Sequence, residues 1–224
     1  MSPTTSSSAK PASPALREAL VTVMQRLEAD GLNRAAAGNA SVRTERGMLI
    51  TPTGVVPSLL APPTMVEMSL AGETLDQFWK PSSEWRFHRD IYRSRPEINA
   101  IVHVHSPYAT ALACTRRDIP PFHYMIAAAG GANVRCAPYA TFGTQALSDH
   151  AVAALIDRRA CLLANHGLIA LGADLERARR TAVEVEELAR QYLLAEQTGH
   201  LVLLSASEID EAIAMFSSYG QQKT

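Results

Sequence analysis

The stretch AIVHVHSP, from Ala100 to Pro107, constrains this chain more than any other feature of its sequence. Its apolar, mostly β-branched residues favour a β-strand, and residues two apart in a strand project from the same face. His103 and His105 therefore lie together, as two imidazoles able to bind one metal ion. Ser106 and Pro107 are typical of the N-cap and first residue of a helix. The alternative interpretation is one histidine bonded within the core and one exposed to solvent.

The composition is that of an ordinary globular domain. The 224 residues are 47% hydrophobic and 19% charged, which suits one α/β domain with a sizeable core. A formal net charge of -1 gives no support to a nucleic-acid partner. No apolar run approaches ~20 residues, so we expect no membrane span.

The start of the chain and its cysteines bear on where the protein works. Residues 1–13 are rich in Ser, Thr and Pro and lack the apolar core of a secretion signal, so we predict a disordered tail. Cys114, Cys136 and Cys161 are far apart and form no C-x-x-C motif, which argues against disulfides and against a cysteine zinc site. We therefore expect a cytoplasmic protein.

Short strands and helices alternate irregularly along the rest of the chain. There is no regular β-α-β repeat, no G-x-G-x-x-G and no Walker loop, which argues against a doubly wound nucleotide-binding sheet. We predict a single α/β domain over residues 14–220, with a mostly antiparallel central sheet flanked by helices in three layers, and a flexible end at 221–224. The predicted helices begin at Ser13–Pro14, at Ser82 or Ser83, at 108, at 148, at 175 and at 208; the predicted strands include 48–51, 65–69, 133–137 and 201–204.

Two further residues are candidates for the same site as the histidine pair. His166 lies in a sharp Asn-His-Gly turn between two predicted strands, and three histidines with one open position form a catalytic zinc pattern. Glu84 is a candidate fourth ligand or base. The alternatives are a hairpin turn that tolerates a histidine and a solvated glutamate on a helix.

Three pairs of small residues are candidates for holding an anion. Each pair offers hydroxyl, amide or free backbone N–H groups, and the serine pair falls at a predicted helix N-terminus, where the helix dipole favours phosphate. Turns use the same residue types, so each pair alone is a weak signal. The pairs are Gly38-Asn39, Thr53-Gly54 and Ser82-Ser83.

Several motifs together resemble the class II aldolase/adducin family. They occur in the order found in that family and extend from Gly31 to Gly220, nearly the whole predicted domain. The motifs are GLNRAAAGNASVR, GMLITPTG, PSSEWRFH, VHVHS, HYMIAAAGG, APYATFGT, LLANHGLIA and the terminal YG.

The resemblance implies a role for each candidate residue. A catalytic Zn²⁺ would be bound by His103, His105 and His166, and Glu84 would be the acid/base and a fourth ligand without substrate. Tyr124 would assist protonation at the aldehyde oxygen, and Tyr219 would reach the site of a neighbouring subunit in a homotetramer with active sites at subunit interfaces. The substrate phosphate would be held by Gly38, Asn39, Thr53, Gly54, Ser82 and Ser83.

The resemblance also implies a reaction, the reversible cleavage of a ketose 1-phosphate, such as L-fuculose 1-phosphate, to dihydroxyacetone phosphate and a small aldehyde such as lactaldehyde. A metal that polarises the ketone removes the need for a Schiff-base lysine. The alternatives are an epimerase acting on L-ribulose 5-phosphate, a dehydratase or decarboxylase of the same superfamily, and a non-catalytic adducin-like module. HYMIAAAGG and the terminal YG favour the aldolase, and the intact histidines and Glu84 argue against the non-catalytic module.

Overall fold

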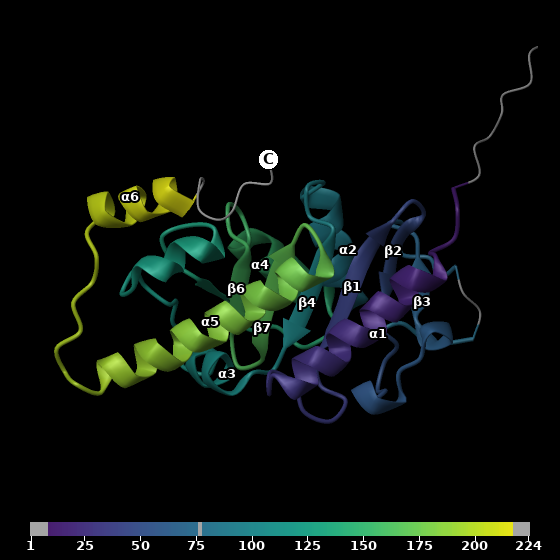
Figure 1. Cartoon of the computed structure of the whole chain (residues 1–224), viewed down its shortest axis with the longest axis horizontal. Helices are drawn as coiled ribbons and strands as arrows, with labels where there is room; N and C mark the ends of the chain where they lie inside the picture. Colours follow the sequence, from purple (N-terminus) through teal and green to yellow (C-terminus); the bar gives the residue numbers. More distant parts are fainter. Residues whose placement is uncertain (1–8, 76–77, 217–224) are drawn as a thin grey trace, which may run out of the picture.

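A seven-stranded β-sheet forms the centre of the molecule (Figure 1). The computed structural model describes residues 9–75 and 78–216. The strands lie in the order β3-β2-β1-β4-β7-β6-β5. Their bounds are β1 Asn39–Thr44, β2 Gly47–Ile50, β3 Val66–Met68, β4 Ala100–Val104, β5 Arg135–Ala137, β6 Ala160–Leu163 and β7 Gly167–Gly172.

The sheet is largely antiparallel, with one parallel pair at its edge. Strands β5 and β6 run parallel, and the other neighbouring pairs in the described sheet run antiparallel. The expectation of a mostly antiparallel sheet therefore needs a correction at this edge. The physical reason is the connection, because a parallel partner needs a long crossover, and α4 (Gln145–Ala154) supplies it between β5 and β6.

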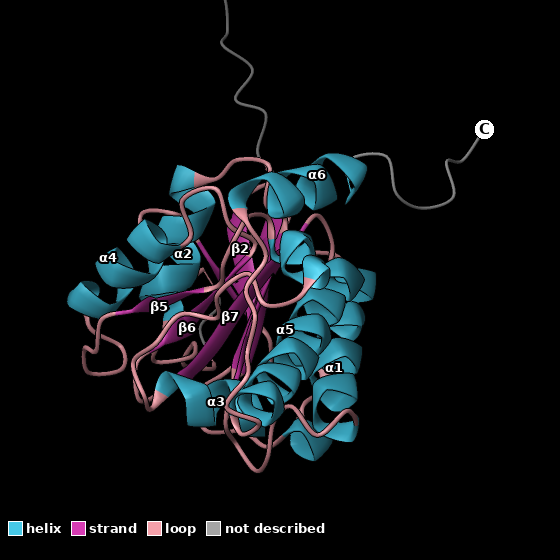
Figure 2. Ribbon diagram, turned by 90° about the vertical axis from the view of Figure 1, so that its left-hand side faces the viewer, coloured by secondary structure: helices cyan, strands magenta, loops and turns pink. Residues whose placement is uncertain are grey.

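Helices cover both faces of the sheet, which gives the three layers predicted from the sequence (Figure 2). Helices α1 (Pro14–Ala29), α3 (Pro107–Ala113) and α5 (Leu175–Glu196) pack on one face, and α2 (Trp85–Ser94) and α4 pack on the other. The remaining helices are α6 (Ala206–Phe216) and the 3-10 helices η1 (Pro57–Leu59), η2 (Pro62–Thr64) and η3 (Tyr124–Ala129). Each face has its own buried apolar cluster.

Alternation along β4 decides which layer each of its side chains enters. Val102 and Val104 belong to the cluster under α1, α3 and α5, whereas Ile101 belongs to the cluster under α2 and α4. Because side chains two apart share a face, His103 points toward the α2 layer, where its ring meets Phe87 edge-on at 5.6 Å.

Most of the predicted helix and strand positions are confirmed, and two details are wrong. The hydroxyl of Ser13 caps α1 as expected, but the N-cap of α2 is Glu84, since Ser82 forms a turn that precedes the helix. Residues 201–204 form no strand. This segment is a continuous apolar run, but no strand of the described sheet pairs with it, and Val202 is 81% exposed.

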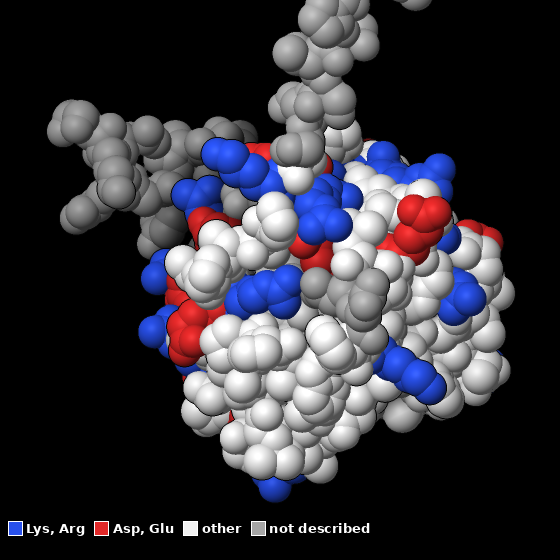
Figure 3. Space-filling model, turned by 90° about the vertical axis from the view of Figure 1, so that its right-hand side faces the viewer, with Lys and Arg blue, Asp and Glu red and all other residues white. Residues whose placement is uncertain are grey.

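The chain ends fall largely outside the described residues. These include Tyr219, the predicted flexible end at 221–224 and most of the predicted disordered tail at 1–13, which all stay predictions. No described helix is long and apolar enough to cross a membrane. On the face drawn in Figure 3, Lys and Arg residues are interspersed with Asp and Glu.

Candidate metal centre and anion pocket

His103 lies fully buried near the end of β4, with one ring nitrogen committed to the backbone. Its Nδ1 is 3.0 Å from the carbonyl oxygen of Leu168 on β7. A carbonyl only accepts hydrogen bonds, so Nδ1 donates its proton and Nε2 carries the lone pair. Burial, and then the neighbouring His105, lower the pKa of His103 to about 3. The ring is therefore neutral, in the tautomer that binds metals through Nε2.

His105 and His166 complete a triangle of imidazoles around one point. The ring centroids are 4.8 Å apart for His103–His105, 4.8 Å for His103–His166 and 5.0 Å for His105–His166. One nitrogen from each ring lies within 4.8 Å of the others. Burial, and then His103, lower the pKa of His166 to about 4. The structure therefore brings together the three histidines predicted from the sequence.

Gly167 allows this close approach. It follows His166 at the start of β7, and a Cβ here would lie 2.5 Å from the carbonyl oxygen of Val104. The same Cβ would lie 3.0 Å from the ring of His105 and 3.2 Å from that of His103. A larger residue would therefore force apart the strand ends that carry the histidines.

Glu84 directs both carboxylate oxygens at the histidines. Its Oε2 is 3.3 Å from Nε2 of His103, and its Oε1 is 3.2 Å from Nε2 of His166. Oε2 also accepts a hydrogen bond of 2.9 Å from the amide of Asn39. Oε1 is buried, and among the described residues it has no hydrogen-bond donor.

These four side chains fit a divalent cation. His103 Nε2 lies 2.9 Å from Nε2 of His105 and 3.3 Å from Oε2 of Glu84, and because it carries a lone pair it donates to neither. Two acceptors at 3.3 Å in a buried site are unfavourable. A cation among them would satisfy the imidazole nitrogens and the orphaned Oε1 together, and three histidines with a carboxylate are a donor set that suits zinc.

A cavity of about 300 Å³ opens beside the three histidines. Glu84, His105 and His166 line it, and His103 lies behind them. Its described lining contains no Lys or Arg, so backbone N–H, amide and hydroxyl groups are the donors that an anion would meet there. All six residues predicted to hold a phosphate line the cavity: Gly38, Asn39, Thr53, Gly54, Ser82 and Ser83.

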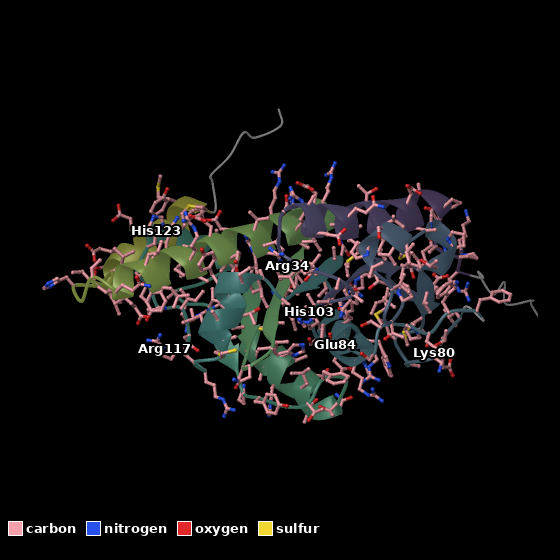
Figure 4. All side chains as sticks on the ribbon, turned by 90° about the horizontal axis from the view of Figure 1, so that it is seen from below. Arg34, Lys80, Glu84, His103, Arg117 and His123 are labelled. Carbon is pink, nitrogen blue, oxygen red and sulfur yellow. The ribbon has the colours of Figure 1, made fainter. Side chains whose placement is uncertain are left out.

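Tyr124 is not among the residues that line this cavity. It begins η3, where it is 56% exposed and its ring lies 6.3 Å from that of Phe216 on α6. Figure 4 shows the neighbouring His123 beside α6, well away from His103 and Glu84. Within one chain, the structure therefore does not bring Tyr124 to the site.

The sequence did not single out several residues that shape the site. Asn33 accepts a hydrogen bond of 3.0 Å from the backbone N–H of His105. Tyr139, Phe142 and Asn165 line the cavity. The signal was partly present, because the aromatic pair belongs to the APYATFGT motif and Asn165 precedes His166, but neither motif indicates which cavity its residues line.

The chain belongs to the class II aldolase family. A family model described as the Class II Aldolase and Adducin N-terminal domain matches residues 18–193. The fold, the histidine triangle and the motif order agree with this match, which confirms the family predicted from the sequence.

The relatives are sugar-phosphate aldolases by name. A 5-methylthioribulose-1-phosphate/5-deoxyribulose-1-phosphate aldolase of Rhodospirillum rubrum is 48% identical over 92% of this chain and 93% of its own length. An L-fuculose phosphate aldolase of Escherichia coli strain K12 is 49% identical over 85% of this chain and 88% of its own length. A solved L-fuculose 1-phosphate aldolase superposes with a TM-score of 0.89 at 38% identity, over 92% of this chain and 98% of the other.

Proposed function

We propose that this protein reversibly cleaves a ketose 1-phosphate to dihydroxyacetone phosphate and a small aldehyde. The observation that carries the proposal is that a candidate metal site and a candidate phosphate site share one cavity. The histidine triangle with Glu84 lies beside the six candidate phosphate-binding residues. A ketose 1-phosphate carries its phosphate next to its carbonyl, so one molecule can occupy both sites.

His103, His105, His166 and Glu84 would hold one divalent cation, and we propose Zn²⁺. A bound cation of this kind polarises the substrate carbonyl and disperses the negative charge that develops during cleavage. Because the cation performs this role, no Schiff-base lysine is needed, in keeping with the lack of lysine in the described lining.

Glu84 is the residue that we assign to proton transfer. When the C3–C4 bond of the ketose breaks, the C4 hydroxyl loses its proton and becomes the carbonyl of the aldehyde, and the electron pair left at C3 takes up a proton to give dihydroxyacetone phosphate. The reverse reaction begins by removing that proton. A positioned carboxylate can give up and take back a proton at C3, and Glu84 lines the cavity where the substrate would lie.

The names of the relatives point to ketose 1-phosphates that differ at the far end. Fuculose, 5-methylthioribulose and 5-deoxyribulose phosphates are named for proteins of similar identity to this chain. The 1-phosphate is the group that we expect this protein to require. The aldehyde end would face Tyr139 and Phe142, which are 53% and 64% exposed and line the cavity.

We further propose a cytoplasmic homotetramer with active sites at subunit interfaces. The proposed role of Tyr124 implies a shared site, because this residue lies away from the cavity of its own chain. Tyr219, which lies outside the described residues, would likewise serve a neighbouring subunit.

A cleavage assay over a panel of ketose 1-phosphates tests the proposed function. The panel contains L-fuculose, 5-methylthioribulose and 5-deoxyribulose 1-phosphates, with released dihydroxyacetone phosphate as the readout. L-ribulose 5-phosphate, scored for epimerisation, is the control for the alternative enzyme class. Release from at least one 1-phosphate supports the proposal, and epimerisation without any release contradicts it.

A further inference from the structure

A continuous row of hydrogen bonds runs from the core to Glu84. Asn39 Nδ2 donates to Glu84 Oε2 at 2.9 Å, and Asn39 Oδ1 is 2.5 Å from Nε2 of His88. The other nitrogen of His88, Nδ1, is 2.7 Å from the hydroxyl of Ser41, which is 2.9 Å from the hydroxyl of Tyr92. All five side chains are buried. We call this row the Glu84 relay.

The relay arises where a helix and a strand with matched spacings face each other. Glu84, His88 and Tyr92 are four residues apart and share one face at the start and along the length of α2. Asn39 and Ser41 are two apart on β1 and share one face of the sheet. Figure 1 shows α2 beside β1. The hydrogen bonds of the row pass alternately from a side chain of α2 to a side chain of β1.

The carboxylate fixes the direction of every hydrogen bond in the relay. An ionised carboxylate can only accept, so the amide nitrogen of Asn39 faces Glu84 and its oxygen faces His88. Nε2 of His88 must then donate. Burial, and then the nearby His103, lower the pKa of His88 well below its usual value, so Nδ1 of the neutral ring accepts from Ser41.

The far end of the relay is consistent with this direction. Ser41 gives its only hydroxyl proton to His88, so the hydroxyl of Tyr92 donates to Ser41. Burial raises the pKa of Tyr92, which therefore keeps its proton. Each group in the row thus donates toward Glu84.

The relay prevents the Asn39 amide from turning over. If it turned, its oxygen would face the Glu84 carboxylate and its NH₂ would face the N–H of His88. Both contacts would then be unfavourable in a site that is almost fully buried, where unmatched polar groups are costly.

We propose that His88 is a positioning residue that acts on Glu84 through Asn39. It holds Oε2 of Glu84 in a hydrogen bond and leaves Oε1 turned toward His166, where Oε1 would bind the cation without substrate and would transfer the proton once substrate takes its place. This inference rests on the proposed role of Glu84, and it adds a residue that does not line the cavity.

The tautomer of His88 tests the relay without any activity measurement. Nuclear magnetic resonance of wild-type protein labelled with ¹⁵N-histidine distinguishes a protonated from an unprotonated ring nitrogen, and the His88→Gln spectrum identifies the signals of His88. We expect a neutral ring with the proton on Nε2. A proton on Nδ1 alone would overturn the relay, because Asn39 would then have no donor to fix it.

Two substitutions of His88 separate positioning from packing. His88→Leu fills space but donates nothing. We expect it to lower the turnover for exchange of dihydroxyacetone phosphate protons with deuterated water by about 10- to 100-fold, the range for residues that support a metal site, and to change KM by less, since KM reports only the phosphate contact of Asn39. His88→Gln places an amide N–H near the position of Nε2 and should restore most of the rate. Ile91→Val, a buried change on the same helix, should lower stability with no loss of rate.

Each outcome of this experiment decides the proposal. Equal loss in His88→Leu and His88→Gln, full activity in His88→Leu, or a raised KM with unchanged turnover would each contradict it, the last because Asn39 would then matter only for phosphate. If wild-type protein supplied with excess zinc catalysed no proton exchange in dihydroxyacetone phosphate, the proposed function would be contradicted instead. The tautomer of His88 would still show whether the hydrogen bonds of the relay run as proposed.

Discussion

Individual side chains set the chemistry of this site, and the histidine triangle permits the first prediction. Because His103 is neutral, with Nδ1 bound to the Leu168 carbonyl, its removal takes away a preorganised ligand. We expect purified protein to contain about one divalent metal per chain and His103→Ala or His166→Ala to lose most of it, as measured by elemental analysis. His200→Ala, at an exposed histidine, is the matched control. Full metal content in both site variants would exclude this centre.

Glu84 gives the second prediction at this scale. Glu84→Gln keeps the size and shape of the side chain but cannot accept a proton as a base. We expect the variant to fold and to lose proton exchange into dihydroxyacetone phosphate by about 10²-fold or more, as measured in deuterated water. If the variant exchanged protons at the wild-type rate, the base would be another group.

The metal ligands could be predicted from the sequence better than the residues that position them. His103 and His105 could be predicted as ligands because strand alternation places them on one face. His166 could be predicted because it lies in a sharp turn between two strands and completes a three-histidine zinc pattern. The role of His88 could not be predicted, because a histidine in the helical stretch WRFHRDIY resembles a solvent-exposed residue. Only its position opposite β1 shows that it is buried.

At the scale of elements, Asp90 joins the two helices on one face of the sheet. It lies on α2, where it accepts hydrogen bonds from Arg89 and from Gln145 and Ser148 of α4. Burial opposes its ionisation, but the hydrogen bonds from Arg89, Gln145 and Ser148 outweigh burial and lower the pKa of Asp90 to about 2.

This pKa predicts a pH-dependent contribution to stability. Because the native pKa is below that of an unfolded aspartate, ionised Asp90 stabilises the fold above about pH 4, and the effect fades as the pH falls toward 2. After allowance for solvent screening, we expect Asp90→Asn to cost about 1 kcal/mol at pH 7. The difference in melting temperature between Asp90→Asn and wild type should narrow from pH 7 to pH 3. Asp210→Asn, at an exposed aspartate, is the control and should melt at the wild-type temperature at both pH values. A gap that stayed constant would assign the loss to packing.

Helices and strands could be predicted where the local sequence pattern favours an element and the fold also provides a surface or strand for it to pack against. The helix from Ser13–Pro14 has both a capping hydroxyl and an apolar face, and it formed as expected. Residues 201–204 have a strand-like pattern, but the described sheet ends at β3 and β5 and neither edge pairs with them. The parallel pairing of β5 with β6 depends on how α4 crosses between them, which composition and periodicity do not specify.

At the scale of the whole molecule, the proposed catalytic role of Tyr124 predicts an oligomer. This residue lies beside α6 and away from the cavity of its own chain, so a role in catalysis requires a neighbouring copy. Light scattering at micromolar concentration should give a mass of about four chains of 24.2 kDa, in keeping with a closed symmetric assembly. A stable, fully active monomer would contradict both the assembly and the shared site.

The C-terminal segment provides the last prediction. Tyr219 lies outside the described residues, and we propose that it helps to close a neighbouring site and to position the aldehyde. Truncation after Ser217 should leave metal content, melting temperature and proton exchange largely intact, because those depend on the histidines and Glu84. Cleavage of the carbon–carbon bond should fall by roughly 10²-fold or more.

Tyr219→Phe is the matched control for this truncation, because it removes the hydroxyl and keeps the segment. If the hydroxyl itself acts, this variant should lose most of the cleavage rate that the truncation loses; if the segment mainly excludes water, it should lose little. Both rates can be measured on one preparation, with released dihydroxyacetone phosphate for cleavage and deuterium uptake for exchange. Unchanged cleavage after truncation would show that the segment has no catalytic part, and a family member with another activity would then be the better interpretation of this chain.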